Sequence, residues 1–129
     1  MKKLTILLLA VFTLFASCRK DDDNEPVKTS RTLQYNLTGN FSGSSLIVSF
    51  TTATGGTSNE PINILPWNKE VTYNANVTAA NIAVSGNGGT PGQKVTLIIK
   101  RGGVDVGAPI VATADASGSF TKAAPAVVF

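Results

Sequence analysis

The sequence contains no histidine and only one cysteine among its 129 residues. Histidine is the commonest general base and metal ligand near neutral pH, and a nucleophilic serine or cysteine needs a base beside it. A single cysteine cannot form a disulfide within the chain. These absences exclude histidine-based zinc sites, histidine-dependent catalytic dyads and triads, and a fold held together by disulfides.

Charged residues are also scarce, at 15% of the chain, and they are unevenly spread. Eleven Lys or Arg residues stand against eight Asp or Glu residues, but six charges lie within residues 19–25 alone. From Arg31 to Phe129, six basic residues face four acidic ones, which leaves a net charge of only +2. The pI of about 9.2 therefore overstates any basic face, and we expect no nucleic-acid partner.

The N-terminus has the pattern of a secretory signal. Two lysines at positions 2 and 3 precede an apolar run over residues 4–15, and the small residues Ala16 and Ser17 follow. This order is typical of a signal peptide. Because the apolar run is shorter than the ~20 residues of a membrane-spanning helix, we predict a signal peptide over residues 1–17 rather than an uncleaved membrane anchor.

The only cysteine follows this segment directly. The stretch Phe15-Ala16-Ser17-Cys18 resembles a bacterial lipobox, in which the cysteine is lipidated and becomes the first mature residue, although Phe15 stands where an aliphatic residue is usual. The alternative is a stray thiol near a conventional cleavage site, in a chain bound for an oxidising compartment. We predict acylation of Cys18 by fatty acids such as palmitate, since two or more acyl chains hold a protein stably at a membrane.

A burst of charge follows Cys18, from Arg19 to Glu25, and ends at Pro26. Such a run stays solvated, and we predict a flexible acidic tether over residues 18–31. A lysine followed by acidic residues just after a lipidated cysteine also resembles the signal that sends some Gram-negative lipoproteins to the cell surface. We expect surface exposure at the outer membrane, and a periplasm-facing anchor is the alternative. The residues of this predicted export signal are Lys20, Asp21, Asp22 and Asp23.

From Thr32 onward, apolar and polar residues alternate with the period of a β-strand, and no helical stripe is present. The cleanest alternation covers residues 71–78, where Val71, Tyr73 and Val77 share one face. Glycine-containing segments between the alternating runs supply the turns. The expected strands cover residues 32–39, 45–52, 62–65, 71–78, 82–85, 95–100, 104–112 and 119–129.

Seven or eight short strands over residues 32–129 predict a single all-β domain, an antiparallel immunoglobulin-like β-sandwich. The Cys…Trp…Cys signature of true immunoglobulin domains is missing, so this prediction rests on the strand pattern. Residues 123–129 are apolar. We expect them to form a final sandwich strand, and a partner-binding tail is the alternative.

Two sequence stretches carry a family resemblance: Thr-Thr-Ala-Thr-Gly-Gly-Thr at 51–57 and Ile-Leu-Pro-Trp-Asn-Lys-Glu-Val-Thr at 64–72, followed by a glycine-containing hairpin at 95–106. In this order they resemble small membrane proteins of the MmpS type and their lipoprotein relatives. The resemblance implies an N-terminally anchored immunoglobulin-like sandwich and, in mycobacteria, an accessory role beside a lipid or siderophore exporter. The cysteine pair common in that family is absent here, and the exporter role follows only by analogy of fold.

Candidate chemistry is sparse within residues 31–129. No Gly-x-Ser-x-Gly motif occurs, and the glycine-rich stretch 86–92 precedes a predicted strand, so we interpret it as a hairpin loop rather than a phosphate-binding loop. The carboxylates lack a paired or metal-ligand spacing, although two could still meet in space as a glycosidase-type pair. We therefore expect no catalytic residues, no metal and no cofactor. The four carboxylates are Glu60, Glu70, Asp105 and Asp115.

Trp67 is the candidate contact for a partner or ligand. An exposed tryptophan can stack on a sugar ring or anchor a protein partner, and the alternative is that Trp67 caps one end of the core. We expect Tyr35 and Tyr73 to lie in the core. Lys94, Lys100 and Arg101 could form a small cationic edge or simply protect strand ends from aggregation.

Together these features predict a non-catalytic, lipid-anchored envelope protein that acts as a binding or accessory scaffolding module of a membrane complex. Its expected partners are the membrane, through the lipid on Cys18, and a protein of the envelope. The alternative is a surface glycan-binding or adhesion module, which requires Trp67 and a neighbouring aromatic residue to be exposed on one plane. An enzyme would require two carboxylates, or a lysine beside a serine, to converge in a pocket.

Overall fold

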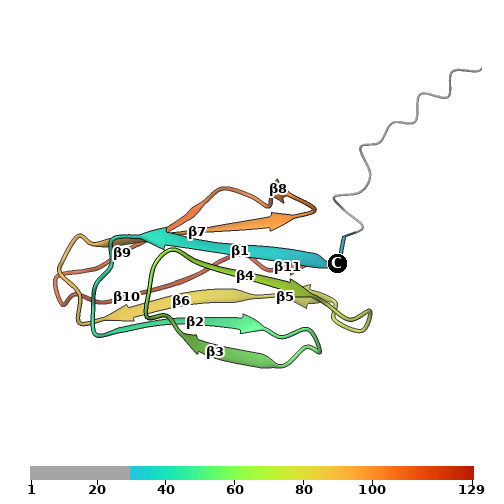
Figure 1. The fold of residues 1–129 in the computed structure, drawn as a ribbon, viewed down its shortest axis with the longest axis horizontal. Helices are drawn as coiled ribbons and strands as arrows, with labels where there is room; N and C mark the ends of the chain where they lie inside the picture. Colours follow the sequence, from blue (N-terminus) through green and yellow to red (C-terminus); the bar gives the residue numbers. More distant parts are fainter. Residues whose placement is uncertain (1–29) are drawn as a thin grey trace, which may run out of the picture.

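The computed structural model describes residues 30–129 (Figure 1). The predicted signal peptide, the predicted lipidation site Cys18 and the predicted export signal of Lys20, Asp21, Asp22 and Asp23 lie outside the described residues. Within residues 30–129, no helix has the length and apolar character needed to cross a membrane.

The described residues form eleven antiparallel strands and no helix. Eight strands have four residues or more, as the alternation pattern predicts, and the other three have only two residues each. The strands are β1 Thr32–Gly39, β2 Ser45–Thr51, β3 Thr57–Pro61, β4 Trp67–Thr72, β5 Ala79–Ala80, β6 Ile82–Asn87, β7 Lys94–Arg101, β8 Val104–Asp105, β9 Ile110–Thr113, β10 Phe120–Ala123 and β11 Val127–Val128.

Two sheets form the layers of a β-sandwich, which confirms the predicted fold class. One sheet has the order β4-β1-β7-β8, and β9 also pairs with β7. The other has the order β10-β6-β2-β3, and β11 pairs separately with β5. Figure 1 shows β1 and β7 in one layer and β2, β3 and β6 in the other. Consecutive strands often change layers, so β1 lies between strands that come much later in the chain.

The core lies between the layers and follows the period-2 alternation of the longer strands. Leu33, Tyr35 and Leu37 on β1 are fully buried, whereas Gln34 and Thr38 are exposed. Side chains of β2 and β6 face them from the other sheet with the same alternation, and those of β7 continue the buried face beside β1. Burial of this apolar surface is the main stabilising contribution to the domain.

The two predicted core tyrosines are buried and bonded to each other. The Tyr35 and Tyr73 hydroxyl oxygens are 2.6 Å apart, and the Tyr73 hydroxyl donates to the carbonyl oxygen of Thr51 at 3.0 Å. Because Tyr73 uses its proton on Thr51, Tyr35 donates to Tyr73. Desolvation raises the pKa of both hydroxyls, and the bond to Tyr73 raises the pKa of Tyr35 further.

We expect tyrosinate absorbance of the folded protein to appear at a higher pH than in the unfolded chain, where an unperturbed tyrosine ionises near pH 10. These are the only two tyrosines in the chain, so absorbance at 295 nm reports on this pair alone. The raised pKa values stabilise the fold below pH 10, and this stability is lost as the pH rises towards the folded pKa values. The urea-unfolded chain is the control and should titrate near pH 10. Half of the full absorbance change near pH 10 in the folded protein would contradict the buried pair.

The prediction of a strand over residues 71–78 is wrong beyond Thr72. Strand β4 covers residues 67–72, and the backbone then turns, with the Val77 N–H donating to the carbonyl oxygen of Asn74 at 3.0 Å. Arg31 holds this turn in place. Its guanidinium donates to the carbonyl oxygens of Tyr73, Asn74 and Val77 and so ties the turn to the start of β1.

A second difference concerns the segment before β4. Residues 62–65 are not a strand, whereas Thr57–Pro61, part of which was expected to be a turn, forms β3. β3 pairs only with β2. Its sequence, Thr-Ser-Asn-Glu-Pro, carries no apolar alternation because it is an edge strand with little buried surface.

One end of the sandwich holds both the start of β1 and the C-terminal residue (Figure 1). The guanidinium carbons of Arg31 and Arg101 lie 4.5 and 5.1 Å from the centre of the Phe129 ring. Arg101 also donates to the carbonyl oxygens of Ser30 and Val128. We call this the tether end, and the opposite end, which carries the β1–β2, β6–β7 and β9–β10 loops, the loop end. The C-terminal residues are therefore packed on the domain, but the predicted strand over residues 119–129 is interrupted: β10 covers Phe120–Ala123, and only Val127–Val128 forms the short strand β11, which pairs with β5.

Candidate functional site

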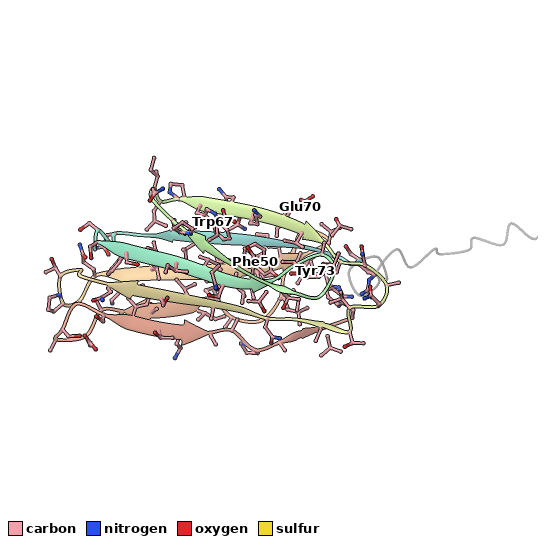
Figure 2. All side chains as sticks on the ribbon, turned by 90° about the horizontal axis from the view of Figure 1, so that it is seen from below. Phe50, Trp67, Glu70 and Tyr73 are labelled. Atoms are coloured by element: carbon pink, nitrogen blue, oxygen red, sulfur yellow. The ribbon has the colours of Figure 1, made fainter. Side chains whose placement is uncertain are left out.

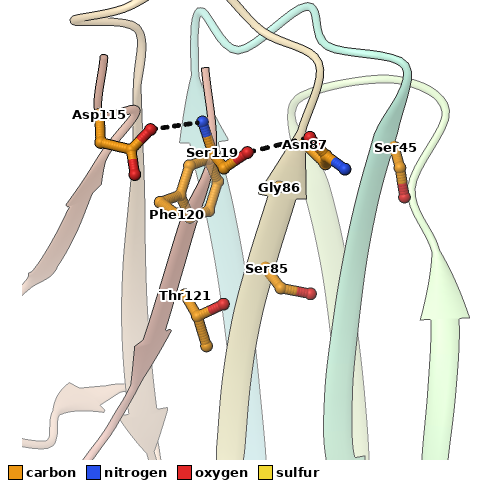
Figure 3. A pocket seen from close by; sticks show the side chains of 8 residues that line it. All are labelled: Ser45, Ser85, Gly86, Asn87, Asp115, Ser119, Phe120 and Thr121. Carbon is orange, nitrogen blue, oxygen red and sulfur yellow. Dashed lines mark hydrogen bonds between the residues drawn. The ribbon is translucent and has the colours of Figure 1, made fainter. Parts of the chain in front are cut away.

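A polar pocket lies at the loop end, where β2 begins, β6 ends and β10 begins (Figure 3). Its volume is about 410 Å³, which lies within the ~300–1,000 Å³ typical of small-molecule sites. Most of its lining side chains carry a hydroxyl, an amide or a carboxylate. The lining residues are Ser45, Ser85, Gly86, Asn87, Asp115, Ser119, Phe120 and Thr121.

Strand register brings the pocket residues together from distant parts of the sequence. Thr121 on β10 lies opposite Ser85 on β6, and Asn87 on β6 lies opposite Ser45 on β2. Each of these side chains alternates with an inward-facing neighbour, such as the buried Leu46. The hydroxyl groups of Ser45, Ser85 and Thr121 therefore project from the outer face of the sheet, and none of the three forms a hydrogen bond with another described residue.

The wall of the pocket is a loop that Asp115 organises. The Asp115 Oδ1 atom accepts the backbone N–H groups of Ser117 and Ser119 at 2.8 and 3.1 Å, and the Ser117 hydroxyl at 2.6 Å. These hydrogen bonds hold the pKa of the Asp115 carboxyl below its ordinary value, with the Ser117 hydroxyl contributing most. The Ser119 hydroxyl in turn donates to Asn87 Oδ1 at 2.9 Å. The Asp115 carboxylate thus remains ionised at neutral pH, and its three hydrogen bonds hold it against its own loop.

Glycine fixes the position of this loop against the β6–β7 loop. Gly118 adopts a φ of +75°, and the N–H of Gly89 donates to the carbonyl oxygen of Gly118 at 3.0 Å. A Cβ atom at position 118 would lie 2.0 Å from the carbonyl oxygen of Gly89. Only glycine permits this approach, so the pocket wall is held by backbone packing rather than by long side chains.

The chemistry available in the pocket is hydrogen bonding. Its lining includes one carboxylate and no Lys or Arg. Among residues 30–129, no group of three acidic or cysteine side chains is placed to hold a metal ion. The spacing Ser119-x-x-Lys122, a pattern that can mark a serine nucleophile, occurs in the sequence. In the structure, however, the Ser119 hydroxyl donates to Asn87 rather than to Lys122.

Trp67, the residue predicted to contact a partner or ligand, is half-buried and packed against the core. Its Nε1–H donates to Glu60 Oε1 at 3.0 Å, and Lys69 Nζ lies 2.9 Å from the other carboxylate oxygen. Trp67 and Lys69 lie on β4 and Glu60 on β3, so this cluster joins the edges of the two sheets. Figure 2 shows Trp67 on this side of the sandwich, with Phe50 and Tyr73 inside it.

No second aromatic side chain forms an exposed plane with Trp67 in the part of the chain that the structure describes. Every aromatic residue from Tyr35 to Phe129 is buried or half-buried. Tyr35 and Phe50 pack against each other inside the sandwich, and Phe41 packs edge-on against Phe120 at the loop end. Stacking of a sugar on an aromatic platform therefore has no support in this geometry.

The Glu60 cluster predicts a small pH dependence of stability. The Lys69 ammonium and the Trp67 N–H hold the pKa of the Glu60 carboxyl below its ordinary value of 4.5. Ionised Glu60 therefore stabilises the fold above pH 4.5, and this stability is lost as the pH falls through the lower folded pKa. Because about a third of the side chain is exposed, we expect Glu60→Gln to cost only about 0.5 kcal/mol at pH 7.

Urea unfolding at several pH values tests this expectation, since the difference between native and variant should vanish in acid. Glu70→Gln is the matched control because Glu70 is bonded to the uncharged Gln34. An equal loss of stability in both variants, or a loss that persists in acid, would contradict the role of Glu60.

The remaining predicted residues are dispersed. Asp105 forms an ion pair with Lys100 at 2.8 Å, Glu70 lies on the outer face of β4, and Asp115 lies at the loop end. The Arg101 side chain packs at the tether end, Lys100 pairs with Asp105, and Lys94 lies at the other end of β7. These three residues therefore do not form the predicted cationic edge. Sequence reasoning treats Asp115 only as an isolated carboxylate. It does not identify Ser45, Ser85, Asn87 or Thr121 as site residues, because only strand register brings them together.

No protein-family model matches this chain, and no curated protein matches it either. The resemblance to MmpS-type proteins therefore remains a prediction, and the candidate site is interpreted from its own geometry.

Proposed function

We propose that this protein is a non-catalytic, lipid-anchored envelope module that binds its partner or ligand at the loop end. The observation that carries the proposal is the position of the two ends of the sandwich. The described chain enters β1 at the tether end, and the polar pocket lies at the opposite end of the strands. An acyl anchor on Cys18 would hold the tether end towards the membrane and present the loop end away from it.

Apolar surface at the loop end supports binding to an envelope protein. The Ile64 side chain is 79% exposed. It borders a hollow of about 320 Å³ whose lining mixes apolar residues such as Ile62 and Leu65 with polar ones such as Ser42 and Asn63. An exposed aliphatic side chain beside a hollow of mixed polarity offers one contact for a protein partner. An accessory role in a membrane complex is consistent with this surface.

The separation of reactive groups supports the non-catalytic part of the proposal. The four carboxylates of the described residues have separate partners: Glu60 contacts Lys69, Glu70 contacts Gln34, Asp105 contacts Lys100, and Asp115 contacts its own loop. A glycosidase-type pair needs two carboxyl groups within ~10 Å across one site.

Metabolic labelling with an alkynyl fatty acid, followed by protease shaving of intact cells, tests the anchor. We expect label on the native chain and none on Cys18→Ala, and we expect shaving to remove the domain. A labelled domain that survives shaving would favour the periplasm-facing alternative. Absence of label on the native chain would overturn the lipid anchor and the orientation derived from it.

A further inference from the structure

We propose that the loop-end pocket binds one residue of an uncharged saccharide through hydrogen bonds, without aromatic stacking. This proposal rests on the proposed function, because it names the class of ligand that the anchored module would hold. The ligand class follows from the groups that line the pocket, the charges among them and the stiffness of the pocket wall.

The lining presents hydrogen-bonding groups without internal partners. The hydroxyls of Ser45, Ser85 and Thr121 each combine a donor with acceptor sites, and they project from adjacent strands. Adjacent strands lie ~4.8 Å apart, which is close to the width of one sugar ring. In Figure 3 the hydroxyls of Ser85 and Thr121 lie side by side below the loop. A polyol can satisfy such hydroxyls because its own groups both donate and accept.

The negative charge of the lining disfavours anionic ligands. Asp115 is the only charged residue of the pocket, so an anionic sugar or a phosphate would meet a carboxylate and no cation. The Asp115 Oδ2 atom has no hydrogen bond within the described residues, because Oδ1 accepts all three bonds of the loop. Oδ2 can therefore accept the hydroxyl of a neutral ligand, in a charge-assisted bond that is stronger than a neutral one.

The polar wall is held before any ligand binds. Gly118 packs directly on Gly89, and the Ser119 hydroxyl donates to Asn87 Oδ1. This bond also orients the Asn87 amide, because Oδ1 accepts from Ser119 and the Nδ2 donors remain available. Such preorganisation lowers the entropy cost of binding, which matters for a site that lacks aromatic stacking.

The test is isothermal titration of the acylated chain in a phosphocholine detergent, which carries no sugar that could compete. The probes are chitotriose, maltotriose and mannotriose, which separate N-acetylated envelope-type sugars from plain hexose chains. We expect at least one to bind saturably. Thr121→Val, which removes a hydroxyl but keeps the side-chain shape, and Ser85→Ala should each weaken binding roughly tenfold, the loss of one or two hydrogen bonds.

Two matched variants control for general effects of removing a hydroxyl. Thr38→Val changes an exposed threonine on β1 of the other sheet, and Ser49→Ala changes a half-buried serine on β2 outside the pocket. Both should bind as the native chain does. Unchanged urea midpoints in all four variants would show that any loss of affinity does not come from unfolding.

Three results would overturn the proposal: no binding of any neutral trisaccharide, equal binding by native protein and by a Ser85→Ala/Thr121→Val double variant, or stronger binding of a trilysine peptide than of every sugar. The labelling and shaving experiment uses no sugar, so the two proposals can fail separately. A surface-labelled chain that binds no sugar keeps the anchored module and loses the saccharide site.

Discussion

Leu37→Ala should lower the free energy of unfolding by about 2–5 kcal/mol, the range measured for removal of a fully buried leucine side chain. Leu37 is 0% exposed in the second half of β1 and lies opposite Trp67 on β4 and Leu97 on β7. Strands on both sides hold its backbone, so the cavity cannot close by a shift of an edge. A domain of this size has a total stability of ~5–15 kcal/mol, and the variant would therefore lose a large part of it.

Urea unfolding followed by circular dichroism provides the measurement, because Trp67 fluorescence reports on the mutated site itself. The matched control is Thr38→Ala, one residue further along β1, where the side chain is exposed and the expected change is within about 0.5 kcal/mol. Equal losses in the two variants would contradict the alternation of buried and exposed residues on β1.

Arg31→Ala should lower the free energy of unfolding by about 2–4 kcal/mol, because one guanidinium serves several partners at the tether end. It donates to three carbonyl oxygens between Tyr73 and Val77, and two of these bonds are partly buried. Bonds from a charged donor contribute about 1.5–3 kcal/mol, and stacking on the Phe129 ring adds about 0.5–1 kcal/mol. These contributions are not additive, so the expected loss is smaller than their sum.

Hydrogen exchange provides a second measurement for Arg31→Ala, since residues 73–78 should lose protection before the sheets do. Arg31→Lys keeps the charge but not the planar fork of donors, and should recover less than half of the loss. Lys94→Ala, an exposed cation near the loop end, is the control for charge. A loss no greater than that of Lys94→Ala would contradict the bonding of residues 73–78 by Arg31.

Alternation predicted the fold class and the longer strands well because it reports burial of one strand face. The predicted strand 32–39 coincides with β1, and the predicted strand 45–52 exceeds β2 by one residue. Alternation could not identify β3, since an edge strand with polar side chains has no apolar face to show. It also continued through residues 73–78, where burial of Tyr73 and Val77 persists although the backbone has left the sheet.

The candidate site was less accessible to sequence reasoning than the fold. Trp67 was the candidate contact because an exposed tryptophan can stack on a sugar ring or anchor a partner, but its Nε1–H donates to Glu60 within the domain. The pocket residues are common serine, threonine and asparagine side chains, and their meeting depends on pairing between distant segments, Ser45 with Asn87 and Ser85 with Thr121. The one local signal was Asp115-Ala116-Ser117-Gly118-Ser119, whose side-chain acceptor and glycine are typical of a tight turn.

The position of β1 between late strands also sets the order in which the domain can fold. β1 is the first strand to be synthesised, yet its partners are residues 67–72 and 94–101, and Phe129 packs on Arg31 at its start. Pairing between such distant segments is slow, because the entropy cost of closing the long intervening loop comes before the stabilising contacts form. β1 is thus paired on both sides only when residues 94–101 are available, whereas β2 and β3 can pair as soon as residue 61 has been made. The layer built around the first strand of the domain is therefore the later of the two layers to begin forming.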